Sequence, residues 1–518
     1  MKTFFSICLL VLMAFVGCKP LDVEPQLEIP TEDAFNNVND LEVMINGAYQ
    51  SLQSANCYGA AYKMIPDLFA DYVTINDAAL AKGTTGSSSL FNVYQRQTYG
   101  SVDNVWRESY NCINRCNVVI DAILSNKIKD KSGEYQSNSD RILGEAYCLR
   151  GLMHFELLRL YSHQFGVNEN AQNSGVLLML KPTVNRSNQP RATTREVYEQ
   201  VQGDLIKAAG LLPMDKRPTD IFTYGGRKGG RATKYAALAL LARVYFQKAT
   251  NDDDVMALKY ANEVITNAEY PFPLDADTGG VSYLITSSVN AAPSVIFQIS
   301  NLINPITNEA NSTSKTLLDS YYYQGEESVD FPTIYLLNKN FNANKLGFTN
   351  NDLRIQKGTV GTGNSPRFTK KYQGDILRPA INVPIIRLAE LVLMRAELSY
   401  ANNPSQAVAD VFQIRSNAYD KAVVPGTLGL AALNALSPDS LLKTIINERT
   451  IELNLEGDRL HHFKRVAQRY GNPNFQDLKS FDSKQRNILP SVRYDNFRIL
   501  FQIPDAEIST NPLVVRNP

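Results

Sequence analysis

The sequence of 518 residues predicts a mostly α-helical fold, a scaffold of tetratricopeptide-like helical pairs with an irregular, loop-rich and partly β insertion region. Three similar segments carry apolar side chains at steps of three and four residues, the helical period. A second helical pattern follows two of them after a short polar break. The region from about 270 to 385 is instead rich in Gly, Asn, Ser, Thr and Pro, with short strand-like runs such as "PSVIFQIS".

The three similar segments predict helices that approach their neighbours closely. They align on Arg150, Arg243 and Arg395, and each has a small residue six positions before its arginine. A small residue on an apolar helix face lets a second helix pack close to the backbone. The segments are 143–161, 236–249 and 388–401, and their small residues are Gly144, Ala237 and Ala389.

Two of these segments have an evident partner helix. After 249, "NDDD" interrupts the pattern before "VMALKYANEVITN" resumes it, and after 401 "NNPS" precedes "QAVADVFQIRSNAY". Two helices joined by a short polar turn, over about 34 residues, form the unit of tetratricopeptide arrays. The irregular spacing of the units implies long insertions between them.

Further helices carry recognisable boundaries. In "TTREVYEQVQGDLIKAAGLLP", Thr193 and Glu196 have the spacing of a capping box, and Val197, Val201 and Leu205 form the apolar stripe. Nearer the amino terminus, "IPTEDAFNNVNDLEVMINGAYQSL" predicts two short helices.

The amino terminus predicts a lipoprotein signal. Lys2 precedes an apolar run from Phe4 to Val16, which is too short to span a bilayer and has the length of a secretory h-region. Gly17 and Cys18 close the run and resemble a bacterial lipobox, in which the cysteine is acylated after cleavage. The alternative is an ordinary signal peptide that contains a cysteine.

The predicted domain organisation follows from these patterns. Prolines at 20, 25 and 30 disfavour helix and keep the chain after Cys18 extended, as in a tether. The predicted parts are a signal peptide over 1–17, a lipidated tether over 18–30, and a body over 31–518, with tetratricopeptide-like helices at about 31–268 and 385–470 and a loop-rich ligand region at about 270–385.

Composition excludes nucleic acid as a partner and disfavours metal sites. Lys and Arg number 52, as do Asp and Glu, so no basic surplus is available to hold a polyanion. Beyond the signal and Cys18, four cysteines remain in a body of this size, too few for a disulfide framework. Cys112 and Cys116 are four residues apart, but no histidine or carboxylate completes a metal site there, so we interpret them as buried thiols.

No catalytic constellation is evident. The chain has four histidines and neither a G-x-S-x-G nor an H-E-x-x-H motif. Paired carboxylates in "NERTIELNLEGDRL" have the residue type that a glycosidase requires. However, Glu448, Glu452 and Glu456 lie four residues apart on one helix face, which favours a structural network with arginines.

A glycine-rich stretch also fails as a phosphate site. "GGRKGGRATKYAALAL" places glycines and cations before a helix, an arrangement that suits anions. It lacks the G-x-x-x-x-G-K-[ST] pattern, and no strand precedes it. We interpret it as an entry loop with Thr233 near the helix cap. The sequence therefore predicts no cofactor, no metal and no catalytic residue.

Four segments together resemble the SusD/RagB lipoproteins of Bacteroidetes. "RILGEAYCLRGLMHFELLRLY" and "GRATKYAALALLARVYF" are similar to two helices of that family. "INERTIELNLEGDRLHHFKR" resembles its E-R-x-x-E-L-x-x-E-G-x-R segment, and "LFQIPDAEISTNPLVVRNP" its closing I-P-x-x-E-I-x-x-N-P. The order of the segments matches as well. Val466 replaces a tryptophan common in the family, and the final residues are shorter.

The resemblance implies a function and a location. Such proteins are lipid-anchored in the outer membrane, exposed at the cell surface, and cover a SusC-like TonB-dependent transporter. They capture oligosaccharide, or peptide in RagB-like members, and are not enzymes. The other classes that remain open are a secreted hydrolase on a helical scaffold and a structural tetratricopeptide adaptor.

The ligand is expected on aromatic side chains in loops, because in this family sugars stack on rings. A sugar face on a ring buries enough apolar surface for roughly 1–3 kcal/mol. Two stretches offer such rings, "LFNVYQRQTYG" and "DSYYYQGEESVDFP". We interpret Trp106, the chain's single tryptophan, as a core residue. A glycan-binding protein without an available tryptophan is unusual, so a peptide remains an alternative ligand. The candidate ligand-binding residues are Phe91, Asn92, Tyr94, Arg96, Tyr99, Tyr321, Tyr322 and Tyr323.

Overall fold

The structure is a computed structural model of the whole chain. The residues that it describes are 35–70, 73–75, 93, 102–133, 135–183, 188–214, 230–267, 294–299, 334–336, 352, 354, 359–360, 368–369, 382–419, 429–471, 477–481 and 487–518. Cys18, the tether and all eight candidate ligand-binding residues lie outside them.

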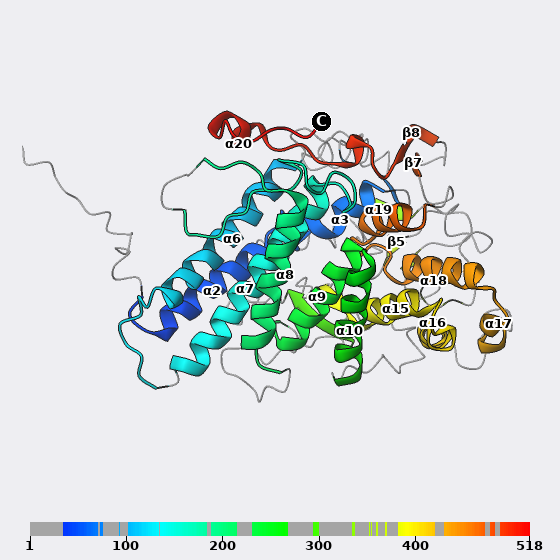
Figure 1. The fold of residues 1–518 in the computed structure, drawn as a ribbon, viewed down its shortest axis with the longest axis horizontal. Helices are drawn as coiled ribbons and strands as arrows, with labels where there is room; N and C mark the ends of the chain where they lie inside the picture. Colours follow the sequence, from blue (N-terminus) through cyan, green and yellow to red (C-terminus); the bar gives the residue numbers. More distant parts are fainter. Residues whose placement is uncertain are drawn as a thin grey trace, which may run out of the picture.

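Helices dominate the described residues, which confirms the predicted fold class (Figure 1). The helices are α2 (Val38–Gln53), α3 (Ala61–Leu68), α6 (Asp103–Leu124), α7 (Tyr135–Tyr161), α8 (Thr194–Leu211), α9 (Lys234–Lys248), α10 (Asn251–Asn267), α15 (Leu388–Ser399), α16 (Pro404–Ala418), α17 (Leu430–Asn434), α18 (Pro438–Glu452), α19 (Arg459–Tyr470) and α20 (Asp505–Thr510).

The long helices form a row of consecutive neighbours. α2 packs on α6, α6 on α7, α7 on α8, and the series continues through α9, α10, α15 and α16 (Figure 1). The three aligned segments are the first helices of the pairs α7–α8, α9–α10 and α15–α16. A Cβ added to Gly144 would lie 2.9 Å from Cγ of Leu212, so the small residue permits the close approach of α8 to α7.

Strands occur in short antiparallel pairs. Their bounds are β1 (Val73–Ile75), β2 (Val295–Ile299), β3 (Ile334–Leu336), β4 (Thr359–Val360), β5 (Phe368–Thr369), β6 (Val383–Arg387), β7 (Asp477–Phe481) and β8 (Asn487–Arg493). β2 falls in the run "PSVIFQIS" and pairs with β6, which leads directly into α15. The partly β character predicted for the region before 385 is therefore present where the structure describes it.

In the first predicted helical stretch the structure describes α2, whose cap is Asn37, and the residues before 35 lie outside the described part. One helix boundary differs from the prediction. "NDDD" forms the first turn of α10 and does not break the pattern, because acidic side chains stabilise a helix amino terminus. The chain reverses instead at Ala249, which has φ of 64°.

Other predicted boundaries are confirmed. Thr193 and Glu196 form the capping box of α8, and its stripe of Val197, Val201 and Leu205 is fully buried. Thr233 is the N-cap of α9, as the entry-loop interpretation requires. Arg231 in that loop pairs with the buried carboxylates of Glu42 and Glu145, which ties the loop to α2 and α7.

The carboxyl-terminal segment lies across one end of the helical row (Figure 1). Phe501 donates its backbone N–H to the Leu160 carbonyl oxygen, and Asn517 donates to that of Tyr161. Most of the apolar core forms one contiguous cluster from α2 to β6 and includes side chains of this segment, so the two ends of the described chain share a core.

Candidate functional site

β1 and β3 form a two-stranded ribbon, and both candidate ligand segments lie between these two strands in sequence order. β1 pairs with β3 antiparallel, with Val73 opposite Leu336 and Ile75 opposite Ile334. The chain that continues toward Phe91–Tyr99 therefore leaves the ribbon at the end at which the chain from Tyr321–Tyr323 enters it. The two strands are more than two hundred residues apart in sequence, so no local sequence pattern could show their pairing.

The interpretation of Trp106 as a core residue is confirmed. Its side chain is 3% exposed and packs against the rings of Tyr110 and Tyr161, with centroids 4.8 and 4.9 Å away. Its indole Nε1 donates to Glu507 of α20 at 3.4 Å. The chain's single tryptophan is therefore unavailable to a ligand at the surface.

The interpretation of Cys112 and Cys116 as buried thiols is confirmed. Cys57, Cys112, Cys116 and Cys148 are free and buried, and burial raises the pKa of the Cys148 thiol above its ordinary range. Within the described part of the chain, no group of three or more His, Cys, Asp or Glu side chains is placed to hold a metal ion. His154 is fully buried, and its Nδ1 lies 3.1 Å from the Arg150 carbonyl oxygen.

The carboxylates of "NERTIELNLEGDRL" form a structural ion-pair network, as predicted. Glu448 accepts from Arg354 and Arg415, each at 2.8 Å. Arg387, 5% exposed in its side chain, donates to Glu452 at 2.6 Å and to both carboxylate oxygens of Glu456. The arginines come from distant parts of the chain, so the carboxylates are held by charge-assisted hydrogen bonds. None is positioned like a solvated catalytic pair.

Two side chains of α3, Lys63 and Asp67, bind backbone groups of the turn after α18. Burial lowers the pKa of Lys63 to about 8, and its ammonium donates to the Glu456 carbonyl oxygen at 3.0 Å. Asp67 accepts from the backbone N–H of Gly457 and Arg459, while burial raises the pKa of its carboxyl group to about 7. A Cβ on Gly457 would lie 2.3 Å from the Tyr62 carbonyl oxygen, so only glycine fits there.

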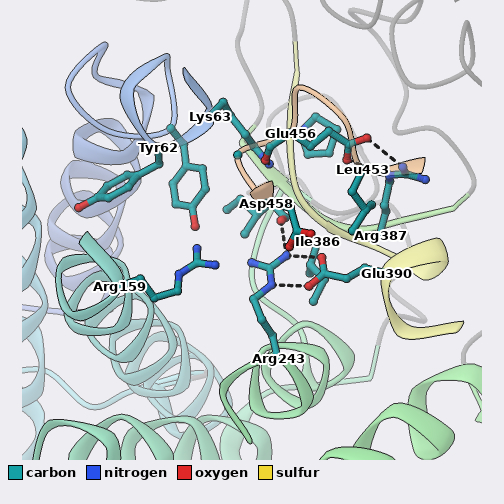
Figure 2. Close-up of a pocket in the computed structure, with 14 residues that line it drawn as sticks. Tyr62, Lys63, Arg159, Arg243, Ile386, Arg387, Glu390, Leu453, Glu456 and Asp458 are labelled. Atoms are coloured by element: carbon teal, nitrogen blue, oxygen red, sulfur yellow. Dashed lines mark hydrogen bonds and ion pairs between the residues drawn. The ribbon is translucent and has the colours of Figure 1, made fainter. Parts of the chain in front are cut away.

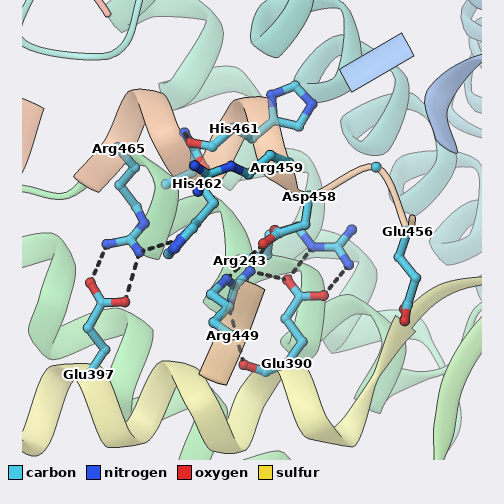
Figure 3. Close-up of polar contacts among 12 residues, drawn as sticks. Arg243, Glu390, Glu397, Arg449, Glu456, Asp458, Arg459, His461, His462 and Arg465 are labelled. Atoms are coloured by element: carbon cyan, nitrogen blue, oxygen red, sulfur yellow. Dashed lines mark hydrogen bonds and ion pairs between the residues drawn. The ribbon is translucent and has the colours of Figure 1, made fainter. Parts of the chain in front are cut away.

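A second set of pairs converges on α15 (Figure 3). Glu390 and Glu397 project from one face of this helix, because they are seven residues apart. Arg243 of α9 binds both oxygens of Glu390 at 2.8 and 2.7 Å, and Arg465 of α19 binds both oxygens of Glu397 at 2.6 and 2.8 Å. Although burial alone raises the pKa of Glu397, the Arg465 guanidinium lowers it to about 2. Neither glutamate stood out in the sequence, because each lies in an ordinary helical pattern.

A pocket lies between α3, α7, α9, β6 and the turn after α18 (Figure 2). Tyr62, Lys63, Arg159, Arg243 and Asp458 line it. Its cavity volume is only about 20 Å³. A single water occupies about this much room, so the pocket is too small for a sugar ring.

Comparison with known proteins identifies the family. One family model, described as starch-binding and associating with the outer membrane, matches residues 19–246, and a second, of the SusD family, matches residues 307–518. The chain belongs to the SusD/RagB family. The buried ion pairs described above lie within the residues that the two family models match. These matched residues therefore build the helical scaffold.

Relatives and solved structures of the SusD/RagB family match over nearly the whole chain. SusD-like protein P2 of Formosa agariphila is 24% identical and covers 95% of this chain and 96% of its own length. A SusD superfamily protein from Bacteroides thetaiotaomicron has a TM-score of 0.73 at 22% identity, with 93% of this chain and 100% of that chain covered. A SusD-like carbohydrate-binding protein from Bacteroides vulgatus has a TM-score of 0.68 at 18% identity, with 93% and 98% covered. At these identities the structures establish the fold alone.

Among the helices that the structure describes, none combines the length and apolar character that a membrane crossing requires.

Proposed function

We propose that this SusD/RagB protein captures oligosaccharide at the outer surface of the cell and delivers it to a SusC-like TonB-dependent transporter without catalysis. The observation that carries the proposal is the pair of family matches, one described as starch-binding and associating with the outer membrane. Acylation of Cys18 would provide the anchor, and the proline-containing stretch to residue 30 would be the tether.

The proposed ligand platform consists of the two aromatic segments. Phe91, Tyr94 and Tyr99 stand in one and Tyr321–Tyr323 in the other, and Asn92 and Arg96 are available as hydrogen-bonding partners. The β1–β3 ribbon supports a common platform, because both segments connect to the same end of it. Stacking of successive rings on sugar faces tolerates different chain lengths, as capture of polymer fragments requires.

A peptide ligand is the second candidate, and Trp106 favours it. A glycan platform commonly uses the large face of tryptophan, yet the chain's single tryptophan is buried against Tyr110 and Tyr161. A peptide would use the same tyrosines through backbone hydrogen bonds and apolar side chains.

Calorimetric titration with a panel of oligosaccharides and peptides, followed by product analysis, tests the proposal. We expect binding without turnover. Tyr94→Ala and Tyr322→Ala should each weaken binding, roughly tenfold for the loss of about 1.4 kcal/mol of stacking. Tyr135→Ala is the matched control, because Tyr135 lies on α7, in the helical scaffold. Hydrolysis of a bound ligand would instead establish the hydrolase class, and unchanged affinity in both variants would disprove the platform.

Two experiments test the location and the partner. Metabolic labelling with radioactive palmitate should mark the protein and fail with Cys18→Ala. Co-purification of a large β-barrel from solubilised outer membranes would support the transporter partnership, whereas isolation of the protein alone under mild detergent would favour a lone adaptor.

A further inference from the structure

The pocket beneath α3 contains two arginines whose hydrogen-bonding capacity is only partly used. Arg159 donates to Glu156 through Nη2, and its side chain is 9% exposed. Its Nε is buried and has no hydrogen-bonding partner. Arg243 donates through Nε and Nη2 to Glu390 and to the Ile385 carbonyl oxygen. Among the described residues, Nη1 of neither arginine donates a hydrogen bond, so both face the pocket without a protein partner.

Each carboxylate that lines the pocket already has an arginine partner. Glu390 is held by Arg243 and Arg449, Asp458 by Arg449, and Glu456 by Arg387. No described carboxylate therefore bridges Arg159 and Arg243, although their guanidinium groups face the same space (Figure 2). The charged side chains that line the pocket are four cations, Lys63, Arg159, Arg243 and Arg387, and three anions, Glu390, Glu456 and Asp458.

We propose that this pocket binds one small inorganic anion of chloride size between Arg159 and Arg243. Each of these groups is a donor without a protein partner, so a ligand between them must accept hydrogen bonds. The cavity volume of about 20 Å³ admits a monatomic anion and excludes phosphate, sulfate or a ligand carboxylate.

Bromide provides a direct test, because it replaces chloride and scatters anomalously. Crystals of the intact lipid-free protein grown in sodium bromide should show an anomalous peak within hydrogen-bonding distance of Nη1 of Arg159 and Nη1 of Arg243. Crystals grown in sodium gluconate should show none. A bromide-grown crystal with water density and no anomalous peak at this position would overturn the proposal.

Thermal unfolding gives a second, solution test. An anion that binds only the folded protein stabilises it by mass action, so Tm should rise as chloride replaces gluconate at constant ionic strength. Arg159→Met should abolish this rise. Arg195→Met is the matched control and should retain it, because Arg195 pairs with Glu169 at the surface. Equal chloride responses in wild type and Arg159→Met would count against the site, and if Arg159→Met does not fold, the bromide experiment on the wild type still decides.

The anion site is independent of oligosaccharide capture. Measuring oligosaccharide affinity in chloride and in gluconate distinguishes the two proposals. Loss of the anion should lower Tm and need not change the affinity for oligosaccharide. Failure of the anion test therefore leaves the proposed function unaffected, and failure of the ligand test leaves the anion site unaffected.

Discussion

Buried cations in this protein are held in two ways. Most, such as Arg243 and Arg465, bind both oxygens of a buried carboxylate. Among the described residues, Lys464 has no carboxylate partner and donates instead to the carbonyl oxygens of Arg159 and Ser162, at 2.8 and 2.9 Å. Because these carbonyls end α7, the ammonium complements the negative end of that helix. The two arrangements act in different pH ranges, because the pKa of Glu397 is lowered to about 2 and that of Lys464 to about 7.

Lys464 should make the protein more stable as pH rises from about 7 to about 10. Burial, and then the positive charge of Arg159, lower the pKa of Lys464 to about 7, whereas in the unfolded chain it is about 10.4. Between these values the unfolded state binds the additional proton, so this residue adds at most about 1.4 kcal/mol of stability per pH unit. Urea denaturation of wild type and Lys464→Met should therefore give curves that diverge above pH 7. Parallel curves would contradict the lowered pKa, and Lys443→Met, at an exposed site, is the control.

Gly457 should tolerate no side chain. Gly457→Ala would place a Cβ 2.3 Å from the Tyr62 carbonyl oxygen and keep φ at 77°, so we expect a loss of about 3 kcal/mol or more. Gly471→Ala separates the two effects. Gly471 has φ of 57° but nothing within 4 Å of the added Cβ, so only the backbone penalty of about 1 kcal/mol should remain. Equal losses in urea denaturation would show that the clash with Tyr62 is relieved.

Helix pairs in the row are joined by a repeated side-chain unit. In α7–α8, Arg150 binds both oxygens of Asp204, which also accepts from Gln200 one turn earlier. In α15–α16, Arg395 binds both oxygens of Asp410, which also accepts from Gln406 one turn earlier. In α9–α10, Arg243 of α9 binds Glu390 of α15 instead. The aligned arginine thus fixes the first helix of each pair against another helix, which is its own partner in two pairs and α15 in the third.

Breaking one such unit should cost far more than breaking a surface pair. Arg150→Met leaves Asp204 fully buried without its cation, and we expect a loss of about 3–5 kcal/mol in urea denaturation. The double variant Arg150→Met/Asp204→Leu should recover much of this, because neither charge is then buried. Arg195→Met, at a pair whose arginine side chain is 42% exposed, should cost about 0–1 kcal/mol. A similar loss in the single and double variants would show that packing, and not the unpaired charge, dominates.

Periodicity and capping in the sequence predicted the helical pairs because these signals are local. The capping box at Thr193 and the alignment on Arg150 depend on residues within a few turns. The partner of Glu448 is different, since Arg354 lies ninety-four residues away and only the folded chain brings them together. The same holds for the β1–β3 pairing, and for this reason the sequence predicted two separate aromatic segments without a common anchor.

The first and last parts of the described chain stabilise each other through the carboxyl-terminal segment. Arg191, which precedes α8, is 2% exposed, and burial lowers its pKa to about 10. It has no carboxylate partner in the part of the chain that the structure describes. It donates instead to the carbonyl oxygens of Gly175 and Val515 and to the side-chain oxygen of Asn517. The segment near residue 515 thus supplies the acceptors for a buried cation near the middle of the chain.

Asn517 should therefore affect the stability of the whole molecule. Its amide also donates to the carbonyl oxygens of Tyr161 and Phe501, at 2.8 and 2.7 Å, so Asn517→Ala leaves two buried acceptors and one charged donor without partners. At about 1–3 kcal/mol for each unsatisfied group, partly relieved by water, we expect a loss of at least about 2 kcal/mol. Hydrogen exchange should also accelerate at the end of α7, which is more than three hundred residues away in sequence. Arg516→Gln is the neighbouring control, since its ion pair with Asp505 is exposed and should contribute about 0–1 kcal/mol. If Asn517→Ala changed exchange only within the last residues of the chain, the carboxyl-terminal segment would be a passive cover, and the shared core would have to be maintained by apolar contacts such as that between Phe501 and Phe69.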